Sequence, residues 1–125
     1  PMLAPMTGKV VYLGPEPERS ASFKLFGNLT LIGIAGVLGD VCRLAHAVGI
    51  APADAMGLFA SFNPGAMLPA RATKIASGPY DQVSFEVAMA RKDVRLMIEE
   101  AKRHGVDLAV MPAVAALQDQ SIARG

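Results

Sequence analysis

Residues 20–49 decide the fold, and they read SASFKLFGNLTLIGIAGVLGDVCRLAHAVG. The stretch has no proline and ends in Gly49, a residue type that commonly follows the last turn of a helix. It predicts one helix of about thirty residues from Ser20 to Val48, which is long for a small domain. Its longest apolar run, Leu29 to Gly39, would rise only about 16 Å, roughly half of a bilayer core, and we interpret it as a buried helix.

Three glycines, Gly33, Gly36 and Gly39, recur every three residues inside this predicted helix. Each glycine disfavours the helix by about 1 kcal/mol relative to alanine. We therefore expect a groove at which another helix packs closely, and the alternative is a bend or hinge.

The chain after residue 50 also reads as helical, so the predicted fold class is all-α. Proline and glycine signals place a turn at Asn63–Gly65. Glu86 is expected to add negative charge to the first turn of the helix predicted over residues 84–104. Arg95 with Glu99, and Glu99 with Arg103, are expected to form ion pairs four residues apart. The predicted helices cover residues 52–61, 67–77, 84–104 with Ser84 as N-cap, and 111 to the end.

One segment, Lys9–Leu13, has the β-branched and aromatic residues of a strand and ends at Gly14-Pro15. A single strand cannot satisfy its own backbone groups, so it needs a partner across a dimer or in a sheet outside this chain. We therefore divide the chain into residues 1–14, a strand remnant, and residues 15–125, a helical domain.

Composition limits the classes of function. The 12 basic and 11 acidic residues give a net charge of +1, which offers no electrostatic argument for a nucleic-acid partner. A single cysteine excludes a disulfide framework and a cysteine-rich zinc site. We find no residue cluster for a metal and no signal peptide, and we expect a cytoplasmic protein without a membrane partner.

Two polar residues near the start of the long helix, Lys24 and Asn28, are four apart and share one helical face. An apolar surrounding would desolvate the lysine and lower its pKa, so that it could exchange a proton with a substrate oxygen. The alternative is a lysine whose stem covers apolar surface while Asn28 forms local hydrogen bonds.

A second group, Phe85, Lys92 and Asp93, lies in the predicted helix 84–104. Seven residues are nearly two turns, so Phe85 and Lys92 lie almost on one line. The ring, cation and anion could frame a small charged ligand, or Phe85 could be a core residue beside two solvated charges.

The order of these features resembles the C-terminal helical domain of the β-hydroxyacid dehydrogenase family. The resemblance rests on a strand ending in Gly-Pro, a long helix that opens with Lys-x-x-x-Asn, and a later helix with Phe-x6-Lys-Asp. It covers nearly all of the chain and implies a fold like the C-terminal domain of 6-phosphogluconate dehydrogenase. It also implies that residues 1–14 are left from a Rossmann domain that this chain lacks.

The resemblance implies a role for each quoted residue. Lys24 matches the catalytic lysine and Asn28 the asparagine that orients it and the substrate. Phe85 and Asp93 match residues that line the substrate pocket, and Lys92 matches the lysine that reaches toward the cofactor, NAD or NADP. The implied partners are a small hydroxy acid or semialdehyde and a second copy of the chain, as a homodimer or higher homo-oligomer.

Two departures border the implied site. Glu18-Arg19-Ser20 stands where the family usually has Gly-x-Gly, and Gly27-Asn28 stands where it often has two asparagines. The substrate identity therefore stays open. The main alternative is a non-catalytic helical dimerisation module, and a helical transcription factor is opposed by the neutral charge.

Overall fold

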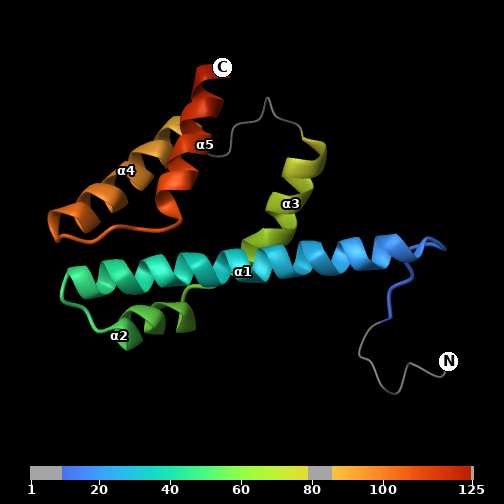
Figure 1. Cartoon of the computed structure of the whole chain (residues 1–125), viewed down its shortest axis with the longest axis horizontal. Helices are drawn as coiled ribbons and strands as arrows, with labels where there is room; N and C mark the ends of the chain where they lie inside the picture. Colours follow the sequence, from blue (N-terminus) through green and yellow to red (C-terminus); the bar gives the residue numbers. More distant parts are fainter. Residues whose placement is uncertain (1–9, 79–85, 125) are drawn as a thin grey trace. The chain divides into compact units, whose positions relative to one another are not determined.

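The structure, a computed structural model, describes residues 10–78 and 86–124 (Figure 1). These residues form α-helices and two short 3₁₀ helices, and they contain no strand. The prediction of an all-α fold is therefore confirmed for the described part of the chain.

The long helix is α1, Pro17–Ala47, and it runs without interruption (Figure 1). It begins three residues before the predicted start because proline, with its fixed φ and missing N–H, suits the first turn of a helix. It ends at Ala47, one residue before the predicted end, and Gly49 follows in a turn with φ +77°. The amide of Ile50 donates to the carbonyl of Ala45 at 2.8 Å, the bond that closes a helix before a left-handed glycine.

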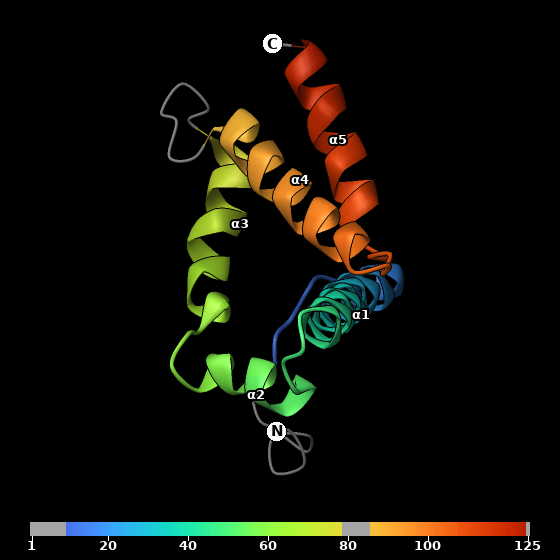
Figure 2. The same ribbon diagram turned by 90° about the vertical axis from the view of Figure 1, so that its left-hand side faces the viewer.

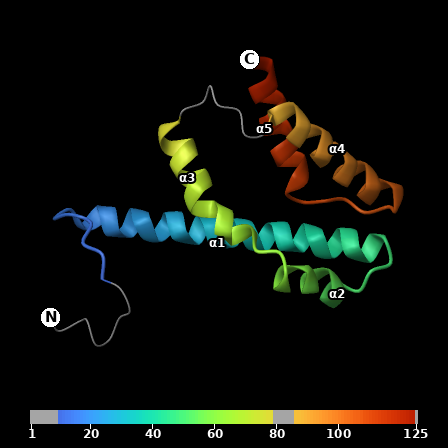
Figure 3. The ribbon, with the colours of Figure 1, turned by 180° about the vertical axis from the view of Figure 1, so that it is seen from behind.

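The other helices follow the predicted order with shifted ends, and the connections after α1 are visible from behind in Figure 3. The predicted turn around Asn63 continues into a 3₁₀ helix because Pro64 occupies its first position. Glu86 is the residue before α4 rather than part of its first turn, and Ser84 lies outside the described residues. The elements are α2 Pro52–Gly57, η1 Leu58–Ala60, η2 Pro64–Met67, α3 Leu68–Ser77, α4 Val87–Arg103 and α5 Met111–Arg124.

The predicted strand is not present in its described part. Residues 10–13 have no regular structure, and Val10, Val11 and Tyr12 are exposed, while Lys9 lies outside the described residues. Extended propensity alone does not make a strand, because the backbone needs a neighbouring strand as partner and the described part of the chain contains none. The chain separates by its internal contacts into residues 1–35 and 36–125, a boundary inside α1. The division at residue 14 stays a prediction.

The first unit consists, in its described part, of residues 10–35 with the N-terminal half of α1. The expectation that the apolar run of this helix is buried is wrong for this chain, since Leu29 is 74% and Ile32 71% exposed. A helix that is apolar on most sides needs cover from another surface. The large exposed apolar residues of α1 in this unit are Phe23, Leu25, Phe26, Leu29, Leu31, Ile32 and Ile34.

The second unit has a small core centred on α4 and α5, which lie side by side (Figure 2). Its buried apolar residues are Ala45, Val94, Ala101, Leu108 and Ala115. Three of the five are alanines, whose small side chains let the backbones approach closely. Arg91 of α4 donates from Nε to Asp119 of α5 at 2.7 Å, and this bond lowers the pKa of the Asp119 carboxyl.

Gly36, one of the three glycines of the predicted groove, lies at a close contact in the second unit. A Cβ added to Gly36 would lie 3.2 Å from a methyl carbon of Val110, so the two segments meet closely there. The contact is with the segment that precedes α5 rather than with another helix. Gly33 and Gly39 would meet no atom within 4 Å among the described residues.

Asp40 is the buried charge of the second unit and is 4% exposed. Its carboxylate accepts from the amides of Ala109, Val110 and Met111 at 2.7, 2.8 and 3.1 Å. Because these amides belong to the start of α5, a carboxylate of α1 serves as the cap of a helix about seventy residues later. Burial raises the pKa of Asp40, but the three bonds and Arg43 outweigh it, and the net pKa is lowered.

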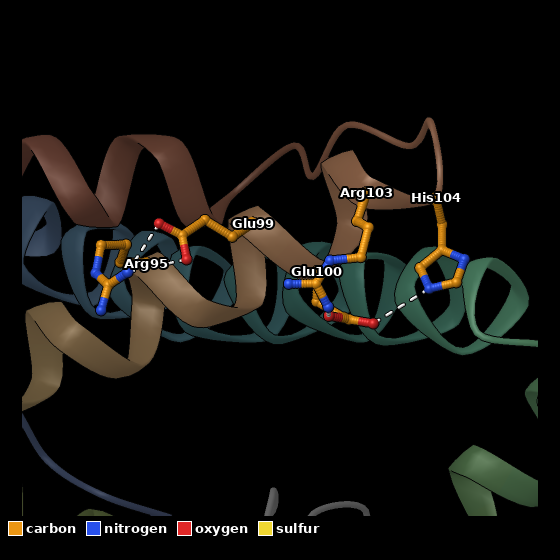
Figure 4. Close-up of polar contacts among 5 residues, drawn as sticks. All are labelled: Arg95, Glu99, Glu100, Arg103 and His104. Carbon is orange, nitrogen blue, oxygen red and sulfur yellow. Dashed lines mark hydrogen bonds and ion pairs between the residues drawn. The ribbon is translucent and has the colours of Figure 1, made fainter.

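The exposed side of α4 carries ion pairs (Figure 4). Arg95 donates to Glu99 at 2.8 Å, which confirms the first predicted pair. The second predicted pair is wrong: Arg103 bonds Glu100, and His104 Nε2 lies 3.1 Å from the same carboxylate. Three groups therefore share the last turn of α4, and all are at the surface, where such pairs stabilise weakly.

Candidate functional site

Lys24 and Asn28 lie one turn apart on α1, and both are exposed. An α-helix turns about 100° per residue, so Asn28 is about 40° around the helix from Lys24. Among residues 20–35 of α1, five further residues lie within about 60° of Lys24. We call the whole set the Lys24 strip: Ser20, Ala21, Lys24, Gly27, Asn28, Leu31 and Ala35.

The Lys24 strip differs from the rest of the helix in side-chain size. Apart from Lys24, Asn28 and Leu31, it contains only serine, alanine and glycine. A Cβ added to Gly27 would meet nothing within 4 Å, so the backbone beneath the strip is accessible. The other large apolar residues of α1 in this unit point about 80° or more away from Lys24.

Neighbouring polar groups on α1 are already used within the helix. Ser22 donates to the carbonyl of Glu18 at 2.9 Å, and Thr30 donates to that of Phe26 at 3.0 Å. The rings of Phe23 and Phe26 contact each other, with centroids 5.7 Å apart, away from the strip. The cation and the amide are therefore the strip's polar groups with the reach to bind a ligand.

The expected desolvation of Lys24 is not present in the described residues. Its side chain is exposed, although Leu25 and Phe26 are its neighbours in sequence. The physical reason is that these apolar side chains project to other sides of the helix and have no cover of their own. A dry environment for the amine would have to come from a surface beyond the described residues.

Lys92 and Asp93 lie in the first half of α4, and their side chains are 49% and 48% exposed. Lys92 Nζ is 3.6 Å from Asp93 Oδ1. A pair this exposed is screened and easily exchanged for a ligand. Phe85 lies outside the described residues.

The two predicted groups of site residues belong to different units of the chain. Lys24 and Asn28 belong to the first unit, whereas Lys92 and Asp93 belong to the second. The resemblance implies that both groups serve one active site, and this stays a prediction.

Sequence reasoning missed one cavity, of about 440 Å³, between α4 and α5. Ile98, Leu108 and Pro112 give it an apolar floor, and Lys102, Asp107 and Asp119 give it charges. Asp119 is already bonded to Arg91, so its charge is compensated within the protein. No local sequence signal marks the cavity, because it arises from the packing of two helices.

Two searches of the described residues bear on function classes. No group of three His, Cys, Asp or Glu residues that could hold a metal ion occurs among them. The one helix among them that is long and apolar enough to cross a membrane is α1, close to the N-terminus. Length and composition alone do not separate a membrane helix from a helix covered by protein.

Comparison of the chain with protein-family profiles, curated proteins and solved structures finds no match.

Proposed function

We propose that this chain is the C-terminal helical domain of an NAD(P)-dependent β-hydroxyacid dehydrogenase or semialdehyde reductase, with a fold like that of 6-phosphogluconate dehydrogenase. The observation that supports the proposal is the Lys24 strip. It presents a cation and an amide on a line of small residues, while the other sides of the helix between Lys24 and Asp40 are mostly apolar. A surface that covers the apolar sides would leave this line as the place where a small polar molecule fits.

The chemistry divides between cofactor and protein. When bound, a nicotinamide would supply or take up the hydride, and the protein would orient the substrate and handle its proton. In reduction, the Lys24 ammonium would donate a proton to the carbonyl oxygen of the substrate. In oxidation, the neutral amine takes the hydroxyl proton. Asn28, one turn along the helix from Lys24, would donate to the same oxygen or accept from the lysine.

The cofactor would be held mainly by a dinucleotide-binding domain, since the 125 residues contain no Gly-x-Gly-x-x-Gly motif. Lys92 is this chain's group for the cofactor, and its exposed ammonium suits an anionic or carbonyl oxygen. Phe85 and Asp93 are the groups assigned to the substrate. The 125 residues alone are expected to be inactive.

The test is turnover by the protein expressed from its complete reading frame, with short hydroxy acids and semialdehydes and nicotinamide absorbance as the signal. Lys24→Ala should lower kcat at least about a hundredfold, the lower end for general acid–base catalysis. Lys102→Ala, which removes another exposed lysine, should leave kcat within about twofold. Near-normal turnover by Lys24→Ala contradicts the catalytic assignment.

Cofactor binding gives an independent check. The 125 residues alone should bind NADPH weakly or not at all in a titration, because the phosphate-binding motif is outside them. Tight one-to-one binding would contradict the division of roles between two domains.

The second candidate is a non-catalytic helical dimerisation module in the cytoplasm, which the exposed apolar residues of α1 favour. A protein surface suits this helix better than a bilayer. Its charge-free stretch between Lys24 and Asp40 is 15 residues and rises only about 22 Å, against a hydrocarbon core of about 30 Å. Sedimentation of the chain should show a dimer or larger oligomer that Leu29→Lys converts to monomer. A well-folded wild-type monomer would contradict the module.

A further inference from the structure

We infer that the cavity between α4 and α5 binds a small zwitterion with an aliphatic side chain, an α-amino acid such as leucine. The cavity of about 440 Å³ lies within the second unit and falls in the size range of small-molecule sites. Lys24 and Asn28 belong to the first unit, so the inference stands apart from the proposed function.

The floor of the cavity is apolar and comes from three parts of the second unit. Pro112, Ala115 and Ala116 line it from α5, which lies beside α4 in Figure 2. The two alanines leave space that longer side chains would fill. Ile98 of α4 and Leu108 of the segment between the helices complete the floor. Because Leu108 and Ala115 are each only 7% exposed, the floor is part of the packed core and holds its shape without a ligand.

Two charges of opposite sign line the same cavity without compensation. Lys102 lies in the last turn of α4, and Asp107 lies in the connection to α5. Neither side chain forms an ion pair with the other or with any residue that the structure describes. The third charged residue of the lining, Asp119, is compensated, since its Oδ1 lies 2.7 Å from Arg91 Nε. The cavity therefore offers a ligand one cation and one anion.

A ligand that carries both signs of charge fits this pair better than a ligand with a single charge. A simple anion attracted by Lys102 would be repelled by Asp107, and a simple cation would meet the opposite problem. An α-amino acid has both charges on one carbon, so its carboxylate can accept from Lys102 while its ammonium donates to Asp107. The flexible stem of Lys102 lets the lysine ammonium follow the ligand's carboxylate.

The lining also selects the side chain of the ligand. Apart from its three charged residues, the lining contains no hydrogen-bonding side chain. A polar ligand side chain would lose water on this floor without gaining a hydrogen bond, whereas an aliphatic one is stabilised by leaving water. We therefore expect leucine to bind more tightly than alanine or serine.

The test is saturation-transfer NMR on the protein expressed from its complete reading frame, with L-leucine as the probe. A Kd of about 1–10 mM is expected for a ligand of this size at an open site. L-Alanine, which has three carbons fewer, should bind at least about tenfold more weakly. 4-Methylpentanoate, which lacks the ammonium, should bind about threefold to fivefold more weakly, the effect of one exposed ion pair. Equal binding of 4-methylpentanoate and leucine overturns the zwitterion, and no leucine binding well above this Kd overturns the site.

Variants locate the site. Ala116→Leu would fill the cavity and should weaken leucine binding at least about tenfold, because two groups cannot occupy one space. The matched control is Ala113→Leu, the same substitution at an exposed position of α5 outside the cavity, which should keep the Kd within about twofold. Lys102→Gln and Asp107→Asn should each weaken binding about threefold to fivefold. All four residues are exposed, so the variants should fold. Leucine binding that Ala116→Leu leaves unchanged, or that Ala113→Leu weakens equally, overturns the assignment of the cavity.

Discussion

Replacing Asp40 by asparagine should destabilise the second unit by about 3 kcal/mol. The carboxylate accepts three amides, one on Oδ1 and two on Oδ2. Asparagine keeps one acceptor oxygen, which can serve Val110 and Met111 through bonds about 1 kcal/mol weaker each, because the charge is gone. Its NH₂ group then faces the Ala109 amide, and two opposed donors cost about 1 kcal/mol more.

Urea unfolding measures the total effect, and thermal unfolding should show a Tm lower by about 10 °C for a domain of this size. Hydrogen exchange should be faster at the three amides of residues 109–111. The control is Asp54→Asn at an exposed position in the first turn of α2, where a change under about 0.5 kcal/mol is expected. If Asp40→Asn unfolds with wild-type stability and unchanged exchange, the carboxylate is not the cap that holds the start of α5.

The remaining predictions concern pH and glycine. The pKa of Asp40 is lower in the folded state than in the unfolded state. The stability that Asp40 contributes is therefore fully present at pH values above its unfolded-state pKa, and it is lost as the pH falls through its folded-state pKa. An acid titration should therefore show that wild type loses stability below about pH 4 and that Asp40→Asn loses less. Gly36→Leu should destabilise by at least about 1 kcal/mol in urea because its side chain meets Val110, whereas Gly39→Ala, in open space, should stabilise by about 1 kcal/mol. Gly105→Ala should destabilise by about 1–2 kcal/mol, since Gly105 has φ +73°; calorimetry of this variant with equal Tm would contradict the strain.

Much of the helical architecture could be predicted because its signals are local. The absence of proline and the terminal Gly49 define α1, and Arg95 and Glu99 pair because four residues bring them to one face. The predicted strand at residues 9–13 is absent from its described part, residues 10–13, for the opposite reason. Its residue types allow an extended backbone, but only a neighbouring strand can stabilise one.

The candidate site could be predicted only in part. The shared face of Lys24 and Asn28 follows from spacing, and the structure adds that both are exposed along a line of small residues. Burial of the amine could not be predicted, because it depends on surfaces outside the helix. The bonds from Asp40 to residues 109–111 were missed, since no short-range pattern links positions 69 apart.

The distance in sequence between Asp40 and its amides has a consequence during protein synthesis. About seventy residues are translated between the exit of Asp40 from the ribosome and the exit of Ala109 and its neighbours. At roughly 5–20 residues per second, this interval lasts several seconds. During this interval the nascent chain exposes the apolar residues of the long helix and an Asp40 carboxylate without its amide partners. Chaperones recognise exposed apolar segments of this kind, and slow codons between the two positions would lengthen the interval.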